Sequence, residues 1–250
     1  MTKDMSQHQK EFYEEYRKQR ENKNYIHTKN DMWIPPRIRV AVNMILRDYN
    51  INGNNSICVL DVGCGEGAFG KLLTERLKDQ VYIVGCDISN PALTRASSLY
   101  SCVFQADIEK NELIEKLYNQ RFDYIILLEV LEHLFIPGKV LSQCYEILKD
   151  DGVLLASLPN IAWYKYRIDM LMGNFPKNYL LYPGEHIQNF SLDSFYKLLL
   201  ESGFSPTEID GQFVFPKIFK PARIFYTIFK KFPNLFGYQL VIKSKKENRS

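Results

Sequence analysis

The segment from Val59 to Gly70 constrains the fold of this chain more than any other. It starts as an apolar run typical of a buried strand, breaks at a turn with Gly63, Gly65 and Gly67, and continues with a helical pattern. Glycine tolerates the positive φ angles of such a turn and lets a ligand approach the backbone more closely than a Cβ atom would allow. The segment therefore predicts a strand, turn and helix of an α/β sheet, with a ligand over the turn.

Strand and helix patterns alternate through the rest of the chain. Strands are expected at 57–61, 81–86, 102–106, 122–128 and 152–158, with helices near 67–78, 91–99, 111–118 and 137–149. A helix near 161–172, a helix between Ser191 and Gly203, and strands at 204–209 and 238–242 follow. We expect an α/β, doubly wound fold, with a mostly parallel seven-stranded Rossmann-like sheet closed by an antiparallel last strand.

The 250 residues, 46% of them hydrophobic, suffice for one such domain. Residues 1–50 are expected to form an N-terminal helical lid, with helices at 6–21 and from Pro35-Pro36 to Tyr49. Residues 51–250 form the main domain, with a substrate-side insertion at about 160–190 and a basic helix at about 216–232. The sequence shows no membrane span or signal-peptide core, and its five cysteines form no C-x-x-C pair, so a cytoplasmic location without disulfides or structural zinc is expected.

Charge decides which ligand suits the glycine-rich turn. Gly65, Gly67 and Gly70 also fit the dinucleotide pattern G-x-G-x-x-G, but that pattern alone is weak. A pyrophosphate over the turn would lie near the carboxylate of Asp61, which costs free energy. The sequence from Asp61 to Gly67, D-x-G-x-G-x-G, instead resembles motif I of the class I S-adenosylmethionine-dependent methyltransferases, whose cofactor carries a sulfonium and an ammonium group.

This resemblance implies roles for the acidic residues that end the next two strands. Asp87 would accept hydrogen bonds from both ribose hydroxyls, and Asp107 would accept one from the adenine amino group. Helix N-capping is the alternative for both, although Ser89 or Asn90 is better placed to cap than Asp87. The full set of expected cofactor-binding residues is Asp61, Gly63, Cys64, Gly65, Gly67, Asp87, Ile88, Asp107, Ile108 and Glu129.

The fourth strand runs into the segment E-V-L-E-H. If the chain turns helical at Glu129, then Glu129, Glu132 and His133 converge on one side and, with His186, could hold manganese, iron or zinc. This pattern resembles that of metal-dependent small-RNA 3′-terminal 2′-O-methyltransferases. E-V-L-E-H also occurs in methyltransferases without metal, where the histidine acts as a base or only forms hydrogen bonds. In that case His133, held by Glu132, would take the proton of a hydroxyl acceptor, with His186 nearby as a further catalytic candidate.

The segments at 157–163, 171–175 and 186–191 resemble methyltransferases of bacterial surface-polysaccharide and glycan pathways. The resemblance implies O-methylation of a small carbohydrate or phosphorylated precursor, with acceptor-side candidates Asn160, Trp163, Tyr164, Arg167 and His186. Ordinary packing is the alternative for the aromatic residues among them. The rival functions are a metal-dependent RNA 3′-terminal O-methyltransferase and an NAD(P)-dependent Rossmann oxidoreductase.

The C-terminal part of the chain is strongly cationic. From Gly211 onward it carries nine lysines and arginines and a single acidic residue, Glu247. The expected basic helix at about 216–232 could be a packed helix with solvated lysines, a membrane-surface helix or part of a pocket for a phosphorylated substrate. No RNA-binding module is recognised, so nucleic acid is not the expected partner.

Overall fold

The computed structural model describes residues 34–51, 56–176, 186–214 and 229–247, together with Glu11 and Thr227. Nearly all of the helix expected at 6–21 and most of the basic helix expected at 216–232 lie outside these residues. No helix within the described ranges is long and apolar enough to cross a membrane.

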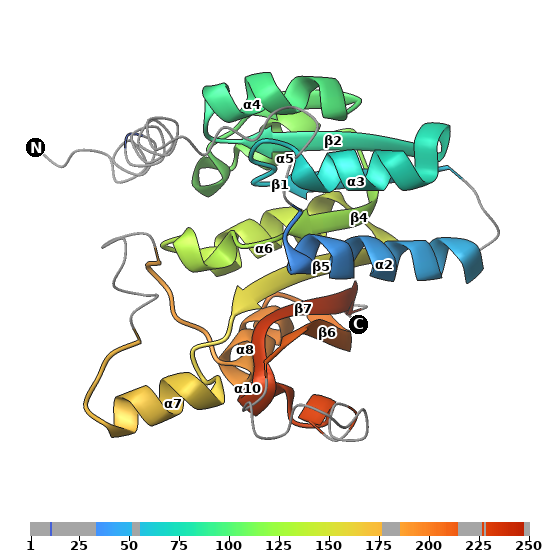
Figure 1. The fold of residues 1–250 in the computed structure, drawn as a ribbon. Helices are drawn as coiled ribbons and strands as arrows, with labels where there is room; N and C mark the ends of the chain where they lie inside the picture. Colours follow the sequence, from blue (N-terminus) through green and yellow to red (C-terminus); the bar gives the residue numbers. More distant parts are fainter. Residues whose placement is uncertain are drawn as a thin grey trace, which may run out of the picture.

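Seven strands form one mixed sheet in the described residues (Figure 1). They are β1 (Ile57–Val62), β2 (Val81–Asp87), β3 (Cys102–Gln105), β4 (Phe122–Leu127), β5 (Leu148–Pro159), β6 (Phe204–Phe213) and β7 (Gly237–Lys246). Their order is β3-β2-β1-β4-β5-β7-β6, with β1 to β5 parallel and β7 antiparallel to both of its neighbours. The expected fold class is confirmed. The last strand does not close the edge of the sheet, however, because β7 lies between β5 and β6.

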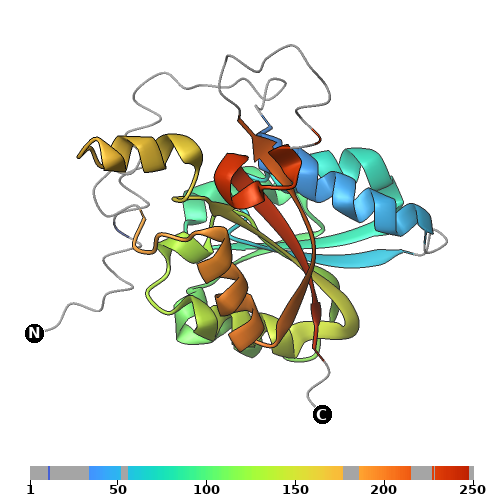
Figure 2. The same ribbon diagram turned by 90° about the horizontal axis from the view of Figure 1, so that it is seen from below.

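Helices cover both faces of this sheet (Figure 2). One layer holds α2 (Pro36–Ile51), α3 (Ala68–Leu77) and α4 (Asn90–Ala96), and the other holds α5 (Glu112–Leu117), α6 (Pro137–Ile147) and α8 (Leu192–Glu201). The short helices α7 (Tyr164–Leu171) and α10 (Pro233–Phe236) complete the described set. Within the lid expected at residues 1–50, α2 is a core helix, because Ala41 and Ile45 have no exposed surface.

Among the element boundaries that differ from the expected ones, two have identifiable causes. Strand β5 begins at Leu148, because Leu148 already pairs with Phe122 of β4 before a bulge shifts the register. Helix α7 begins at Tyr164 and not near 161. The residues before it form hydrogen bonds outside the helix. The Ile161 N–H donates to the Phe190 carbonyl at 3.0 Å, and the Ala162 N–H donates to the side chain of Asn160 at 3.0 Å.

The strand order reverses beside β1, whose two neighbours are β2 and β4. Parallel strands bring their carboxyl ends to one edge of the sheet, and open α/β sheets bind ligands at that edge where the order reverses. The fold therefore gathers the glycine-rich turn after β1, the acidic end of β2 and the E-V-L-E-H segment after β4 in one place.

Candidate active site

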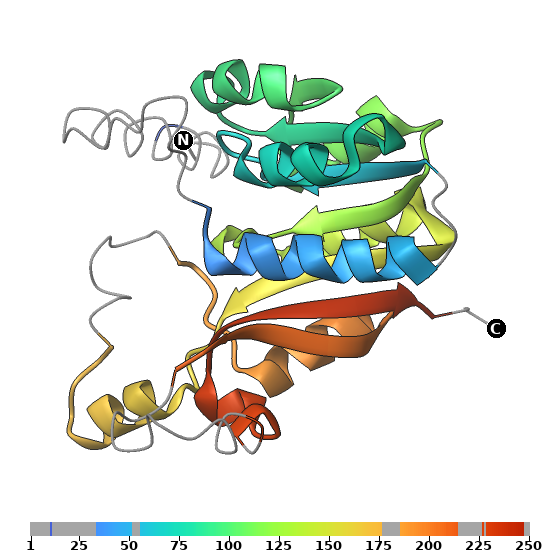
Figure 3. The same ribbon diagram turned by 45° about the vertical axis from the view of Figure 1, so that its right-hand side comes forward.

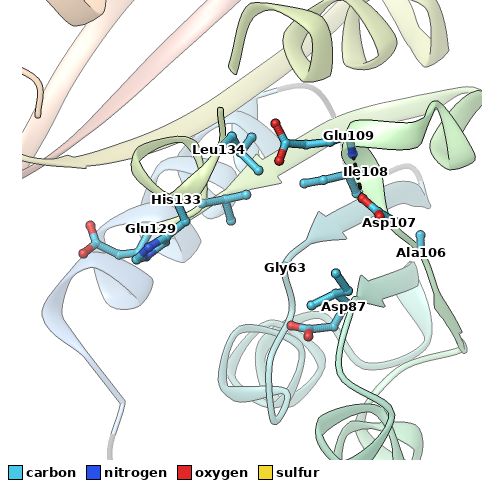
Figure 4. Close-up of a pocket in the computed structure, with 11 residues that line it drawn as sticks. Gly63, Asp87, Ala106, Asp107, Ile108, Glu109, Glu129, His133 and Leu134 are labelled. Atoms are coloured by element: carbon cyan, nitrogen blue, oxygen red, sulfur yellow. Dashed lines mark hydrogen bonds between the residues drawn. The ribbon is translucent and has the colours of Figure 1, made fainter. Parts of the chain in front are cut away.

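A pocket that is open to solvent lies at this edge of the sheet. Figure 4 shows Asp87 and Asp107 on one side of it, and Glu129 and His133 on the other. The residues that line the pocket are Gly63, Asp87, Ile88, Ala106, Asp107, Ile108, Glu109, Glu129, Val130, His133 and Leu134. Six of the residues expected to bind the cofactor are among them, and Asp61, Cys64, Gly65 and Gly67 are not.

The turn after β1 needs its glycines for backbone geometry and for space. Gly63, Gly65 and Gly67 have φ angles of 73°, 56° and 94°, in the region that residues with a Cβ atom rarely adopt. A Cβ atom on Gly63 would also lie 2.6 Å from Cγ2 of Val130, which itself lines the pocket. Val130 can thus pack against the turn at the pocket wall only because residue 63 has no side chain.

Asp87 ends β2 and is tied to the glycine-rich turn. One of its carboxylate oxygens accepts a hydrogen bond from the Gly65 N–H at 2.9 Å, and the other accepts one from the Ser89 N–H at 2.9 Å. Each carboxylate oxygen can accept more than one hydrogen bond. The carboxylate is therefore held in a fixed orientation at the pocket wall.

Asp107 both caps a helix and lines the pocket. It caps the short 3₁₀ helix Ile108–Lys110 by accepting a hydrogen bond from the Glu109 N–H at 3.2 Å, and Lys110 lies 3.5 Å from its carboxylate. Asp107 also lines the pocket. Capping therefore does not remove it from the candidate ligand-binding residues.

The expected contact of Asp61 with the ligand is not what the structure shows. Asp61 is buried and lies outside the pocket lining, and its carboxylate accepts a hydrogen bond from the hydroxyl of Tyr100 at 2.5 Å. The same hydroxyl accepts one from the Gly70 N–H at 3.1 Å. Burial raises the pKa of Asp61 to about 7, although the Tyr100 hydrogen bond opposes the shift. Asp61 thus supports the turn through Tyr100, which also bonds to Gly70.

The expected helix at Glu129 is also corrected. Glu129 has a φ of 60°, the left-handed conformation, so it cannot start the helix that would align it with Glu132 and His133. Ser157 holds it in this conformation, because its Oγ accepts a hydrogen bond from the Glu129 N–H at 2.8 Å and donates one to the Glu129 carboxylate at 3.0 Å. The helical turn that follows is a 3₁₀ helix, Leu131–His133.

Three of the four expected metal ligands still come together. One ligand atom from each of Glu132, His133 and His186 lies within 4.8 Å of the other two, and the group does not include Glu129. The two imidazole rings meet edge to face, with their centroids 5.0 Å apart. The main chain brings His186 to this place, because the carbonyl of Glu132 accepts hydrogen bonds from the N–H groups of Ile187 and Gln188, both at 2.9 Å.

Glu132 is unusual because its carboxyl group is buried without a hydrogen-bond partner. It is 1% exposed, and neither carboxylate oxygen has a hydrogen-bond partner among the described residues. Burial and the neighbouring charge of Glu129 raise its pKa well above the usual range, against an opposing effect of Arg37 at the start of α2. Burial also lowers the pKa of His186, which favours the neutral imidazole that binds metals. A buried, unpartnered carboxylate beside two imidazoles fits a cation or a shared proton.

Comparison with known proteins shows the family to which the chain belongs. Residues 36–209, more than half of the chain, match a protein family described as a methyltransferase domain. The chain belongs to this family. Its fold and relatives identify it as a class I S-adenosylmethionine-dependent methyltransferase.

Individual relatives of this methyltransferase are distant. A ubiquinone biosynthesis O-methyltransferase of Rhodopseudomonas palustris is 27% identical over 58% of this chain and 59% of its own length. The chain therefore spans less than two thirds of that relative. A methyltransferase structure from Archaeoglobus fulgidus has a TM-score of 0.59 at 22% identity, covering 83% of this chain and 94% of its own. Magnesium protoporphyrin IX methyltransferase of Synechocystis, with bound S-adenosylmethionine, has a TM-score of 0.58 at 15% identity, covering 98% and 99%.

The pocket of this methyltransferase fits the cofactor that the family uses. Its wall includes Gly63, where a Cβ atom would displace the lining residue Val130, and two carboxylates at the ends of adjacent strands. Ribose hydroxyls and the adenine amino group are hydrogen-bond donors that such carboxylates accept.

Two of the five acceptor-side candidates have structural contacts that account for them. Asn160 has no exposed surface, and its side chain donates to the carbonyls of Asn234 and Gly237 at 3.0 and 2.8 Å while accepting from Ala162. Asn160 therefore has a structural role at the end of β5, and it does not line the pocket. Trp163 is buried, as the packing alternative predicted, and its indole N–H donates to the Val214 carbonyl at 3.3 Å.

Tyr164, Arg167 and His186 remain candidates on the acceptor side. Tyr164 is partly buried, with its ring 5.1 Å from that of Trp163, and burial raises its pKa. Arg167 is exposed and donates from Nε to the Ala162 carbonyl. Of the three, His186 is the one grouped with His133, which lines the pocket.

Sequence reasoning missed three residues that organise the site. Tyr100 lies under the glycine-rich turn, Ser157 fixes Glu129, and Glu109 lines the pocket and bonds to the chain after His133. Only Glu109 had a usable signal, since it lies two residues after Asp107. The other two act through contacts between distant parts of the chain.

Proposed function

We propose that this methyltransferase transfers the methyl group of S-adenosylmethionine to a hydroxyl oxygen of a small acceptor, with His133 as the base. One observation carries the proposal. A single pocket is lined by Asp87 and Asp107 on one side and by His133 on the other. Carboxylates suited to a nucleoside and an imidazole suited to proton transfer thus face a common space.

Each lining residue has a role in this proposal. Asp87 would accept hydrogen bonds from the ribose hydroxyls, Asp107 one from the adenine amino group, and the turn at Gly63 would let the ligand lie against the backbone. The cofactor supplies an already activated methyl group when bound, so the protein mainly has to position the acceptor. The apolar side chains of Val130 and Leu134 would limit water around the reacting groups.

His133 would remove the proton of the acceptor hydroxyl. An unperturbed imidazole titrates near neutral pH, which suits general base catalysis. The buried carboxyl group of Glu132 and the ring of His186 lie beside it. These neighbours would fix the orientation of the imidazole and hold the proton after transfer.

We also propose that Glu132, His133 and His186 can hold a divalent manganese, iron or zinc ion. Carboxylate and imidazole are suitable ligands for these ions, and the ligand atoms lie within 4.8 Å of one another. Such an ion would lower the pKa of an acceptor hydroxyl, so that a free imidazole base would not be needed. Glu129 is not part of this three-residue set.

Two acceptor classes are supported by different observations. The segments at 157–163, 171–175 and 186–191 support a small carbohydrate or phosphorylated precursor of a surface glycan, through their resemblance to methyltransferases of those pathways. The ubiquinone biosynthesis O-methyltransferases among the relatives support a phenolic acceptor as the second candidate. The dinucleotide oxidoreductase alternative is set aside by the family assignment.

The decisive experiment is transfer of a labelled methyl group to a panel of sugar nucleotides, sugar phosphates and catechols. We expect His133→Ala to lower kcat by about a hundredfold or more with the best acceptor, while the affinity for S-adenosylmethionine stays nearly constant. Transfer to carbon or nitrogen atoms only, or an unchanged rate in the variant, would contradict the proposal.

A further inference from the structure

The end of α7 carries a dense group of exposed apolar side chains. Five of the large hydrophobic residues that are exposed in the described ranges lie in this short stretch, and each is between 43% and 87% exposed. We call them the apolar tip: Ile168, Met170, Leu171, Met172 and Phe175. In Figures 1 and 3, α7 lies well away from the sheet, beyond the end of β5. The apolar tip therefore lies on a segment that projects from the sheet and does not line a groove.

Aromatic contacts on the other side of α7 hold the helix in this position. Trp163 and Tyr166 are buried, and their rings contact the ring of Tyr238 with centroid distances of 5.0 and 6.1 Å. With 3.6 residues per turn, Ile168, Leu171 and Met172 occupy an arc of about 100° that points away from these anchors. The chain thus buries Trp163 and Tyr166 on one side of α7 and exposes Ile168, Leu171 and Met172 on the other.

Cationic residues flank the exposed arc on both sides. On the same helical projection Lys165 lies at one border of the arc and Arg167 at the other, and both side chains are exposed. Asp169 is the single acidic residue of α7, and it is less exposed than either cation. An apolar arc between two long cationic side chains is the pattern of helices that lie in a membrane interface, where the cations reach the phosphates.

We propose that the apolar tip docks onto an anionic lipid surface. A bilayer offers apolar chains below a layer of phosphates, which matches the arc and its two cationic borders. Since α7 follows directly from the carboxyl end of β5, docking would bring the edge of the sheet that carries the pocket close to the lipid. This surface is distinct from the basic C-terminal segment, and the inference does not depend on which acceptor is methylated.

Sedimentation of the full chain with vesicles tests the proposal. Vesicles of phosphatidylcholine alone are compared with vesicles that also contain phosphatidylglycerol. We expect binding to increase with the anionic lipid, and the double variant Leu171→Asp and Met172→Asp to bind at least about tenfold more weakly. Leu200→Asp on α8, which also replaces an exposed leucine, is the matched control and should bind like the unaltered chain.

A second double variant separates the two parts of the surface. Lys165→Gln with Arg167→Gln should abolish the preference for phosphatidylglycerol while keeping weak binding to both kinds of vesicle. All four substituted side chains are exposed, so thermal unfolding should be unchanged. No sedimentation of the unaltered chain, equal binding of the Leu171 and Met172 variant, or a dimer that this variant dissociates would overturn the proposal.

Discussion

The carboxylate of Glu109 accepts a hydrogen bond from the backbone N–H of Phe135 at 2.9 Å. The same oxygen accepts a second one from the N–H of Ile136 at 3.1 Å, and Lys139 donates to the Glu109 carbonyl. Glu109 lines the pocket two residues after Asp107, whereas Phe135 comes two residues after His133, which lines the pocket from the segment that follows β4. One carboxylate thus joins the two walls of the site.

We expect Glu109→Ala to loosen this connection and to lower kcat about tenfold, because the turn that carries His133 loses two charge-assisted hydrogen bonds. Glu109→Gln keeps an acceptor oxygen and should retain most of the activity. Steady-state kinetics with both substrates measures the effect. Glu115→Ala, at an exposed glutamate of α5, is the control. Equal kcat values in Glu109→Ala and the control would show that the connection has no catalytic role.

Asp87 provides the test of the cofactor site. Asp87→Ala should weaken binding of S-adenosylmethionine by about 1.5 to 3 kcal/mol through the loss of charge-assisted hydrogen bonds. Calorimetric titration measures this difference, with Asp79→Ala at an exposed position as the control. Because Asp87 also holds Gly65, the stability of the cofactor-free variant is measured in parallel. Undiminished affinity would be incompatible with a ribose contact at Asp87.

The buried carboxyl group of Asp61 predicts a pH dependence of stability. Its pKa is raised from the ordinary value of 3.8 to about 7 in the fold, so the folded state binds more protons than the unfolded state between these values. The stabilisation is complete below about pH 4 and is lost as the pH rises through about 7. Asp61→Asn removes this contribution and keeps an acceptor for Tyr100.

The variant should therefore gain stability relative to the unaltered protein as the pH rises from about 4 to about 8. The expected change is about 2 to 4 kcal/mol, since one pKa unit corresponds to about 1.4 kcal/mol. Urea unfolding of the cofactor-free protein at both pH values measures it. A stability difference that is the same at both ends of this pH range would rule out a raised pKa at Asp61.

Removal of divalent ions tests the proposed metal site. If Glu132, His133 and His186 hold a metal that takes the place of the free base, chelation should abolish methyl transfer, and manganese, iron or zinc should restore it. His186→Ala should weaken metal retention about tenfold or more by removing one of three protein ligands. Elemental analysis and binding titration follow the metal independently of activity. Full activity after exhaustive chelation, with no metal by analysis, would leave the cluster as an acid and base site.

Asn160 should be important for stability and not for acceptor affinity. Asn160→Ala leaves the carbonyls of Asn234 and Gly237 without their donor in a buried place, which should lower the free energy of unfolding by about 2 to 4 kcal/mol. Denaturant unfolding measures the loss, and Asn174→Ala, at an exposed position, is the control. A stable variant with a strongly raised KM for the acceptor would restore the acceptor role.

The parts of the site that the sequence predicted correctly depend on local patterns. Asp87 and Asp107 follow apolar strands, and the carboxyl ends of parallel strands share one edge, so their placement beside the glycine-rich turn could be inferred. Glu129 could not be placed in this way. Its left-handed conformation depends on Ser157 of another strand, a contact that helical spacing in the segment E-V-L-E-H does not reveal.

His186 and Asn160 are two further residues whose contacts depend on the tertiary fold. The sequence grouped His186 with His133 because both are residue types that bind metals, whereas the structure brings His186 there through backbone bonds to the carbonyl of Glu132. Asn160 has a residue type suited to ligand binding, yet its side-chain amide joins the end of β5 to the start of β7 and to α10. Burial of a polar side chain depends on the tertiary fold, which residue type alone does not specify.

The place of β7 between β5 and β6 has a consequence for biosynthesis. Strand β6 pairs with the sheet through β7 alone, although β6 precedes β7 in the chain. As the chain leaves the ribosome, β6 therefore has no partner strand until residues 237–246 emerge, and the edge of β5 stays open for the same interval. Unpaired strand edges favour association with other chains. Nascent chains stalled before residue 237 should thus be the most aggregation-prone stage in the synthesis of this protein.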